Sequence, residues 1–157
     1  MSYKSIIKVV GVVVAAAAVV FTGCDVYDDP DYGKYEVVNQ SSSWADAKRE
    51  AERRGGYLAV ITSEAEQRTI ESLIGDGTKD RYWIGGYCES DRVWKWVTGE
   101  SMSYTNWGPN DPNNYGGNEY SMSFTRQQFY SQGASTLLGQ WIDEENGRNN
   151  GYIIEFD

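Results

Sequence analysis

Residues 106–119 read Asn-Trp-Gly-Pro-Asn-Asp-Pro-Asn-Asn-Tyr-Gly-Gly-Asn-Glu, and this stretch is most informative when it is taken together with the downstream segment Trp141-Ile142-Asp143. The two segments carry four side chains that end in oxygen: Asp111, Asn113, Glu119 and Asp143. A hard cation such as Ca²⁺ takes about six to eight oxygen ligands, mostly from carboxylates, amide carbonyls and water. The pattern is therefore compatible with a calcium site, although in an acidic chain such side chains are more commonly ordinary solvated surface.

The residues from Gly108 to Gly117 are rich in glycine, proline and asparagine, a composition that no packed helix or strand explains. These residue types favour turns, and an ordered loop of this length is more often functional than incidental. We therefore predict a surface loop that presents Asp111 and Asn113, and a second long loop over residues 126–138.

The first half of the chain carries signals for two helices. Ser43 is expected to cap the first helix, and Gly55-Gly56 is expected to end it. Ser63 followed by Glu66 has the capping-box pattern that opens a second helix, which we expect to end at Gly75.

Short segments of strand-forming residues occur along the rest of the chain. Strands are expected at residues 34–38, 57–61, 81–87, 94–98, 120–124, 139–142 and 152–156. Trp94 and Trp96 share one face at strand spacing, and we interpret them as core residues rather than as platforms for sugar stacking. Two early helices followed by a run of strands predict an α+β fold.

The order and spacing of several motifs resemble the C-type lectin-like domain over residues 33–157. Trp83-Ile84-Gly85-Gly86 resembles the Trp-Ile-Gly core motif of that family. Asp111-Pro112-Asn113 stands where sugar-binding members have Glu-Pro-Asn or Gln-Pro-Asp, and Trp141-Ile142-Asp143 stands at their Trp-Asn-Asp. The resemblance implies two helices packed on small antiparallel sheets beneath a long ligand-binding loop region, with paired terminal strands and with Trp83 and Ile84 buried.

The resemblance also implies a ligand set for one Ca²⁺ ion, made of Asp111, Asn113, Glu119 and Asp143. Two sugar hydroxyls would complete the coordination, and Asp111, Asn113 and Glu119 would also hydrogen-bond them. In the family, the peptide bond before the motif's proline is usually cis, and the acid-then-amide order goes with mannose-type sugars rather than galactose. The implied function is calcium-dependent binding of a carbohydrate or glycoprotein.

Ile142 departs from the family pattern, because it replaces the asparagine of Trp-Asn-Asp and offers neither a metal ligand nor a sugar donor. Asp111 is also one methylene shorter than glutamate. We therefore expect weak to moderate calcium affinity, with water or Glu144, Glu145 or Asn146 available to fill the gap. The alternative is a metal-independent adhesin or a module that binds a protein surface, since one fold can serve many functions.

The chain has two cysteines, Cys24 and Cys88, whereas the family usually has two disulfides. None of the four corresponding positions holds a cysteine here: Ala51, Ile154, Ser121 and Asn146. We expect the first two to meet as apolar partners between the first helix and the last strand. Cys88 is expected to be a partly buried structural thiol.

The first residues, 1–23, have the pattern of a bacterial lipoprotein signal peptide. Two lysines precede an apolar run from Val9 to Phe21, which is too short to span a bilayer comfortably. The run ends in Phe21-Thr22-Gly23-Cys24, which resembles a lipobox, so we expect lipidation of Cys24 and attachment to a membrane of the bacterial cell envelope. A short tether is expected over residues 24–33 and the lectin-like domain over 34–157. A plain secretory signal or an uncleaved anchor is the alternative.

The formal net charge of −9 disfavours contact with phosphates and anionic lipids, so no nucleic-acid partner is expected and the membrane is contacted only through the lipid anchor. The chain has no histidine, which excludes Ser-His-Asp and Cys-His catalysis. A glycosidase with paired carboxylates is a third alternative, but no acidic pair stands in a recognisable catalytic motif. We therefore expect a binding protein without catalytic residues.

Overall fold

The computed structural model describes residues 34–127, 129–131 and 134–157. The expected signal peptide over residues 1–23, the tether over 24–33 and the lipidation site Cys24 lie outside these described residues. Within the described part of the chain, no helix is long and apolar enough to cross a membrane.

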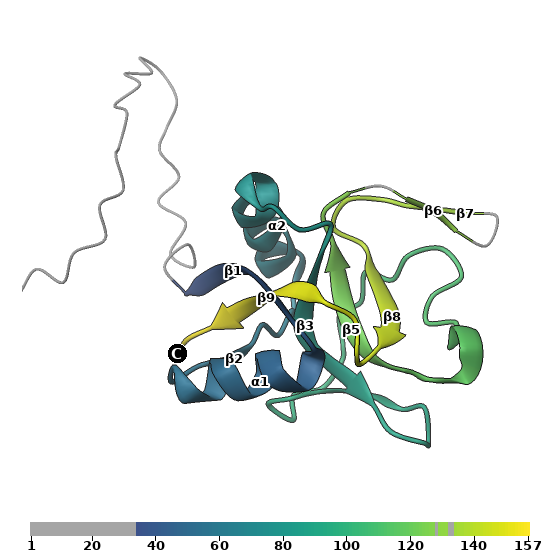
Figure 1. Ribbon diagram of the computed structural model, residues 1–157, viewed down its shortest axis with the longest axis horizontal. Coiled ribbons are helices and arrows are strands. Elements are labelled where there is room, and N and C mark those ends of the chain that lie inside the picture. The colour runs from purple at the N-terminus through teal and green to yellow at the C-terminus, as the bar shows by residue number, and fades with distance from the viewer. Residues whose placement is uncertain (1–33, 128, 132–133) are drawn as a thin grey trace, which may run out of the picture.

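A large sheet with two helices packed against it forms most of the described structure (Figure 1). In chain order the elements are β1 (Tyr35–Ser42), α1 (Trp44–Arg53), β2 (Tyr57–Leu58), α2 (Glu64–Leu73), β3 (Arg81–Cys88), β4 (Trp94–Trp96), β5 (Glu119–Thr125), β6 (Phe129–Ser131), β7 (Ala134–Thr136), β8 (Trp141–Glu145) and β9 (Asn150–Glu155), with short 3₁₀ turns at Ile74–Asp76 and Tyr115–Gly117. The fold is therefore α+β, as predicted.

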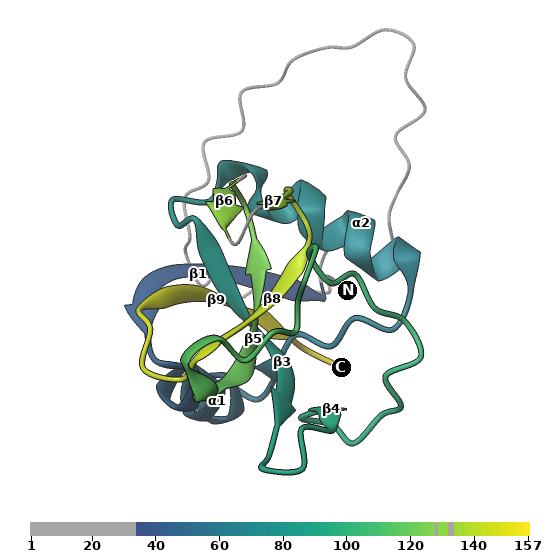
Figure 2. The same cartoon turned by 90° about the vertical axis from the view of Figure 1, so that its right-hand side faces the viewer.

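The main sheet has seven strands, with the order β1-β9-β3-β5-β8 and with β2 and β4 paired to β9 and β3. The terminal strands β1 and β9 are antiparallel, with Tyr35 opposite Glu155, which confirms the expected pairing of the two ends of the domain. The expectation of antiparallel sheets needs one correction: the main sheet is mixed, because β3 and β9 run parallel. They are neighbours in the sheet although β4 to β8 lie between them in the chain (Figure 1, Figure 2).

Both helices begin where the sequence places their caps. The Ser43 hydroxyl accepts a hydrogen bond from the backbone N–H of Asp46 at 3.2 Å, and the Ser63 hydroxyl accepts one from the N–H of Glu66 at 3.2 Å. The Glu66 carboxylate reaches one residue beyond the cap and accepts from the N–H of Thr62 at 2.7 Å. These caps satisfy backbone donors that the first turn of a helix leaves unpaired.

Alternation along β3 divides the core into two clusters, one against each helix. Tyr82 and Ile84 pack with Ile70 of α2, whereas Trp83 packs with Ala47 of α1. Trp83 and Ile84 are both completely buried, as predicted. Successive strand residues point to opposite faces of a sheet, so the single strand β3 supplies both cores.

The tryptophans of β4 also belong to the core. Trp96 is buried against Trp141, with ring centroids 5.5 Å apart, and Trp94 is partly buried, with its ring centroid 4.9 Å from that of Trp107. Both pairs meet edge-on, the arrangement that aromatic quadrupoles favour. The interpretation of Trp94 and Trp96 as core residues is confirmed.

Non-covalent contacts stand at the positions where the family carries disulfides. Ala51 and Ile154 are fully buried in the same apolar cluster, as expected. The Ser121 hydroxyl donates a hydrogen bond to the Asn146 side-chain oxygen at 2.7 Å. Cys88 is free, and its residue is buried, which places the thiol deeper than the sequence suggested.

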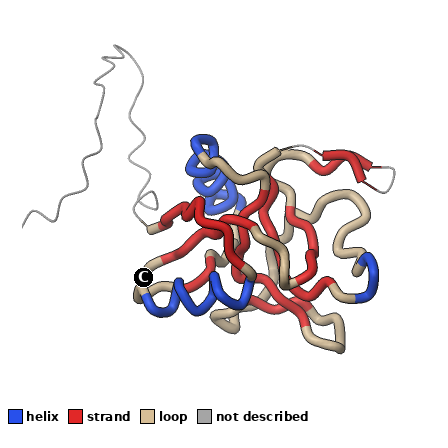
Figure 3. The backbone as a smooth tube through the Cα atoms, viewed as in Figure 1, coloured by secondary structure: helices blue, strands red, loops and turns tan. Residues whose placement is uncertain are grey.

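Several segments differ from the predicted boundaries. Residues 126–138 are not a simple loop, because they contain the hairpin of β6 and β7, with Phe129 opposite Thr136 (Figure 3). The sequence of the hairpin contains aromatic and hydroxyl-bearing residues, which favour strands. It does not alternate between apolar and polar residues, which is the pattern by which half-buried strands are recognised. The strand expected at 57–61 is confined to Tyr57–Leu58, β1 extends to Ser42, and β8 runs from Trp141 to Glu145. The last shift places Asp143 inside a strand.

Candidate functional site

The loop between β4 and β5 is held against β8 along its middle. The N–H of Trp141 donates to the Asn106 carbonyl, and the N–H of Gly108 donates to the Trp141 carbonyl, both at 2.8 Å. The Trp107 ring packs edge-on against the Trp141 ring, with centroids 6.0 Å apart. This anchoring brings the segment that begins at Asp111 alongside Asp143, which follows Trp141 by two residues on the same strand face.

Asp143 is the buried anchor of the loop. Its residue is 2% exposed, one carboxylate oxygen accepts from the backbone N–H of Asn113, and the other accepts from the N–H of Asn114, each at 2.8 Å. Asn114 has a φ of 50°, a left-handed conformation that asparagine tolerates better than most residues. The turn therefore directs two successive amides at one carboxylate.

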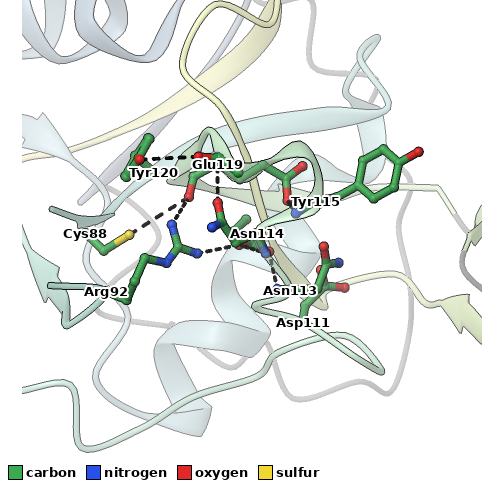
Figure 4. A network of polar contacts seen from close by, with 10 residues as sticks. Cys88, Arg92, Asp111, Asn113, Asn114, Tyr115, Glu119 and Tyr120 are labelled. Atoms are coloured by element: carbon green, nitrogen blue, oxygen red, sulfur yellow. Dashed lines mark hydrogen bonds and ion pairs between the residues drawn. The ribbon is translucent and has the colours of Figure 1, made fainter. Parts of the chain in front are cut away.

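Asp111 and Asn113 lie together on the outer side of this anchor. The Asn113 side-chain N–H donates to Asp111 Oδ1 at 2.7 Å, and the Asp111–Pro112 bond is cis, as expected for the motif. Both residues are drawn in Figure 4, where they point to the same side of the loop.

Glu119 closes the loop at the start of β5. Its Oε2 accepts from the N–H of Tyr115 at 2.6 Å, and its own N–H donates to the side-chain oxygen of Asn114 at 3.2 Å. The Tyr115 ring is 68% exposed and points away from the cluster (Figure 4). The four residues that the sequence singled out are thus all present in one network around the loop.

The two outer carboxyls have strongly raised pKa values. Burial raises the pKa of Asp111 to about 7, helped by the charge of Asp143, a hydrogen bond with that carboxyl and the charge of Glu119. Burial also raises the pKa of Glu119 to about 7, helped by the charge of Asp143. Each ionised form is disfavoured first by burial and then by the other negative charges brought close to it. A bound cation would relieve this repulsion.

Arg92 is the part of this network that sequence reasoning missed. It lies in the turn between β3 and β4 with a φ of 58°. Its Nη2 lies 3.1 Å from Asp143 Oδ2 and its Nη1 donates to the Glu119 carbonyl at 2.5 Å (Figure 4). The guanidinium also faces the rings of Trp94 and Tyr120, at 5.9 and 5.4 Å from their centroids. Arg92 and Asp143 are 51 residues apart, so no local motif links them.

Two of the neighbours that could have replaced the missing family ligand are engaged elsewhere. Ile142 is 5% exposed and lies opposite Ser123, on the other face of the sheet from Asp143. The Glu144 carboxylate is paired with Arg81, and Asn146 accepts from Ser121. Water therefore remains as a substitute ligand, together with Glu145, which is exposed and lies opposite Glu119 at the end of β8.

The oxygen-bearing side chains of the loop are of the types that bind a hard cation, but they are not positioned to coordinate one. Carboxylate and amide oxygens are suitable calcium ligands, and burial together with neighbouring carboxylates raises the pKa values of Asp111 and Glu119. However, among the residues that the structure describes, no set of three or more aspartate, glutamate, cysteine or histidine side chains is arranged to hold a metal ion. Calcium binding therefore requires some of the present hydrogen bonds to be exchanged.

Comparison with known proteins identifies relatives along most of the chain. Residues 40–153 match the family model of the lectin C-type domain. Halomucin of Haloquadratum walsbyi (strain DSM 16790 / HBSQ001) is 33% identical over 158 aligned positions, and the match covers 86% of this chain but only 2% of Halomucin. Lectin BRA-3 of Megabalanus rosa is 24% identical over 163 aligned positions, and the match covers 99% of this chain and 93% of that lectin. The carbohydrate-recognition domain of the mouse scavenger receptor C-type lectin matches with a TM-score of 0.64 at 27% identity, covering 78% of this chain and 88% of that domain.

Proposed function

This chain belongs to the family of C-type lectin domains, and on that premise we propose that it binds carbohydrate at the loop of residues 106–119. The family consists generally of binding proteins rather than enzymes, so we assign no catalytic residue. The observation that carries the proposal is the gathering of Asp111, Asn113 and Glu119 around the buried carboxylate of Asp143.

We propose that the binding depends on Ca²⁺, held by Asp111, Asn113, Glu119 and Asp143. The ion would neutralise carboxylates that otherwise repel one another, and it would offer coordination positions to two sugar hydroxyls. Asn113 can turn its carbonyl oxygen to the metal and its NH₂ to the sugar, while Asp111 and Glu119 can accept hydrogen bonds from the hydroxyls.

The proposed sugar preference is for mannose-type sugars over galactose. It rests on the order of Asp111 and Asn113 around Pro112, which keeps the acid-then-amide order of Glu-Pro-Asn. Tyr115, whose backbone N–H donates to Glu119, turns an exposed ring outward from the loop, and its flat apolar surface with a polar end suits contact with a partly apolar, partly hydroxylated ligand. Comparing mannan with a galactan in calcium-dependent binding tests this preference, and stronger binding of the galactan contradicts it.

Thermal melting in calcium and in chelator tests the calcium proposal. A site with an incomplete ligand set should have a Kd of about 10⁻⁴–10⁻³ M. About 10 mM calcium would then stabilise the folded state by about 1.4–2.7 kcal/mol, which raises the melting temperature of a domain of this size by about 5–10 °C. An identical melting temperature in calcium and in chelator rejects the site.

Asp111→Asn is the sharpest variant for this test. Asp143 also holds two loop amides, so its removal disturbs the loop whether or not calcium binds. The Asp111 side chain hydrogen-bonds only other side chains, those of Asn113 and Asp143, among the contacts of the described residues, and an asparagine can preserve both. We expect Asp111→Asn to melt close to wild type in chelator and to lose most of the rise in calcium.

The second candidate function is a metal-independent interaction module. It is favoured by one specific observation, the guanidinium of Arg92 placed against Asp143 where positive charge is needed. Mannan binding that survives chelator, or protein binding without any effect of calcium, would assign the chain to this second function.

A further inference from the structure

Arg92 joins two elements that the proposed metal site also uses. One guanidinium nitrogen contacts the carboxylate of Asp143 on β8, and the other donates to the backbone carbonyl of Glu119 at the start of β5. The Asp143 side chain is completely buried, whereas that of Arg92 is 30% exposed. A buried carboxylate needs a partner, and Arg92 is the cationic one in this structure.

The contacts of Asp143 leave little room for a second cation. An ionised carboxylate has about four acceptor sites. The N–H groups of Asn113 and Asn114 occupy one site on each oxygen, Arg92 occupies another on Oδ2, and the carboxyl of Asp111 also hydrogen-bonds this carboxylate. Because the two amides hold the loop in shape, Arg92 is the partner that can leave without unfolding it.

We propose that Arg92 and a divalent cation are alternative counter-ions of Asp143, so that Arg92 sets the calcium affinity of the loop. The identity of the ion rests on the proposed function. In the metal-free state Arg92 holds β5 and β8 at the loop, and it must withdraw from Asp143 Oδ2 when calcium binds. The chain thereby lowers its own affinity for the ion.

The position of Arg92 supports a specific role rather than a chance surface contact. Its φ of 58° is uncommon for a residue with a Cβ atom, and such backbone conformations persist only where surrounding contacts hold them. Those contacts are the turn hydrogen bond from its N–H to the Glu89 carbonyl at 3.0 Å and the flanking rings of Trp94 and Tyr120. The rings also offer a place for the guanidinium after it leaves the carboxylate.

Calcium titration by calorimetry of wild type, Arg92→Gln and Arg148→Gln tests this inference, with melting in chelator as a second readout. Arg148 is the matched control, because its charge acts on Glu119 and its removal changes the net charge equally. Arg92→Gln keeps a long polar side chain and the same backbone requirement. We expect Arg92→Gln to lower the Kd for calcium about tenfold, within the usual range of coupling between two ligands, and to melt below wild type in chelator. Arg148→Gln should change the Kd by less than about twofold, as expected for screened surface charge.

The possible results separate this inference from the calcium proposal. If wild type binds calcium and Arg92→Gln binds it no more tightly, or if both variants shift the Kd equally, the inference is overturned and the calcium site stands. If only Arg92→Gln binds calcium, the inference stands and calcium dependence of the natural chain is rejected. If no variant binds calcium, both are rejected.

Discussion

Lowering the pH from 8 to 6 should weaken calcium binding about a hundredfold. Calcium requires Asp111 and Glu119 in their ionised forms, and the pKa of each is raised to about 7. At pH 8 both are largely ionised, whereas at pH 6 each carboxyl is about tenfold more often protonated than ionised. Two such protons must leave for each ion bound, so each contributes about a factor of ten to the Kd.

The number of protons released when calcium binds is a second quantity that tests the same prediction. With both pKa values at about 7, binding of one calcium ion should release about one proton at pH 7 and fewer than about 0.3 at pH 8. Calorimetry in buffers with different ionisation enthalpies measures this number directly. Release that does not change between pH 6 and pH 8 would refute the assignment of raised pKa values to these two carboxyls.

The folding stability of the metal-free domain should fall as the pH rises, whereas calcium affinity should increase. The folded pKa values of Asp111 and Glu119, at about 7, lie above the values near 4 expected in the unfolded chain. Their contribution to stability is therefore fully present below about pH 4 and is lost as the pH rises through about 7. In chelator, wild type should lose stability between pH 5 and pH 8 relative to the double variant Asp111→Asn/Glu119→Gln. Equal slopes for the two proteins contradict this reasoning.

Three further predictions concern other parts of the chain. Ile142→Asn should lower the free energy of unfolding by about 2–5 kcal/mol, since it removes a buried aliphatic side chain, and tighter calcium binding by this variant would show that the side chain reaches the loop after all. Ser121→Cys combined with Asn146→Cys should form a disulfide between positions 25 residues apart, stabilising the domain by up to about 3.5 kcal/mol; a melting temperature that does not fall on reduction speaks against it. Cys24→Ala should release the protein from the membrane fraction or leave it unprocessed, whereas unchanged size and membrane retention would point to another anchor.

The parts of the fold that the sequence predicted are those with local causes. Ser43 and Ser63 cap helices through bonds to residues three positions away, and such contacts can be recognised within a short window. The burial of Trp83 and Ile84 follows from the resemblance of their motif to the family core. The hairpin of β6 and β7 lacks such a signal, because its residues do not alternate between apolar and polar in the sequence.

The site was predictable in its residue types but not in its charge balance. Asp111, Asn113 and Glu119 lie within one loop, and the motif around Pro112 indicates them directly. Arg92 reaches Asp143 only because β3 and β8 both pair with β5 and bring distant turns together. A contact across 51 residues depends on the sheet topology, and no spacing in the sequence encodes it.

The charges at the loop explain why three different partners can compete for it. When Asp111, Glu119 and Asp143 are all ionised, three negative charges meet at the loop, and Arg92 offsets one of them in the metal-free state. Burial and the neighbouring carboxylates then favour protonation of Asp111 and Glu119, which is why their pKa values are raised. Protons and calcium are therefore linked through the same carboxylates, and Arg92 opposes both. Removing Arg92 should strengthen proton binding and calcium binding together, while Asp111→Asn should weaken both; a loop whose acidic residues served only to hold its shape would show no such linkage.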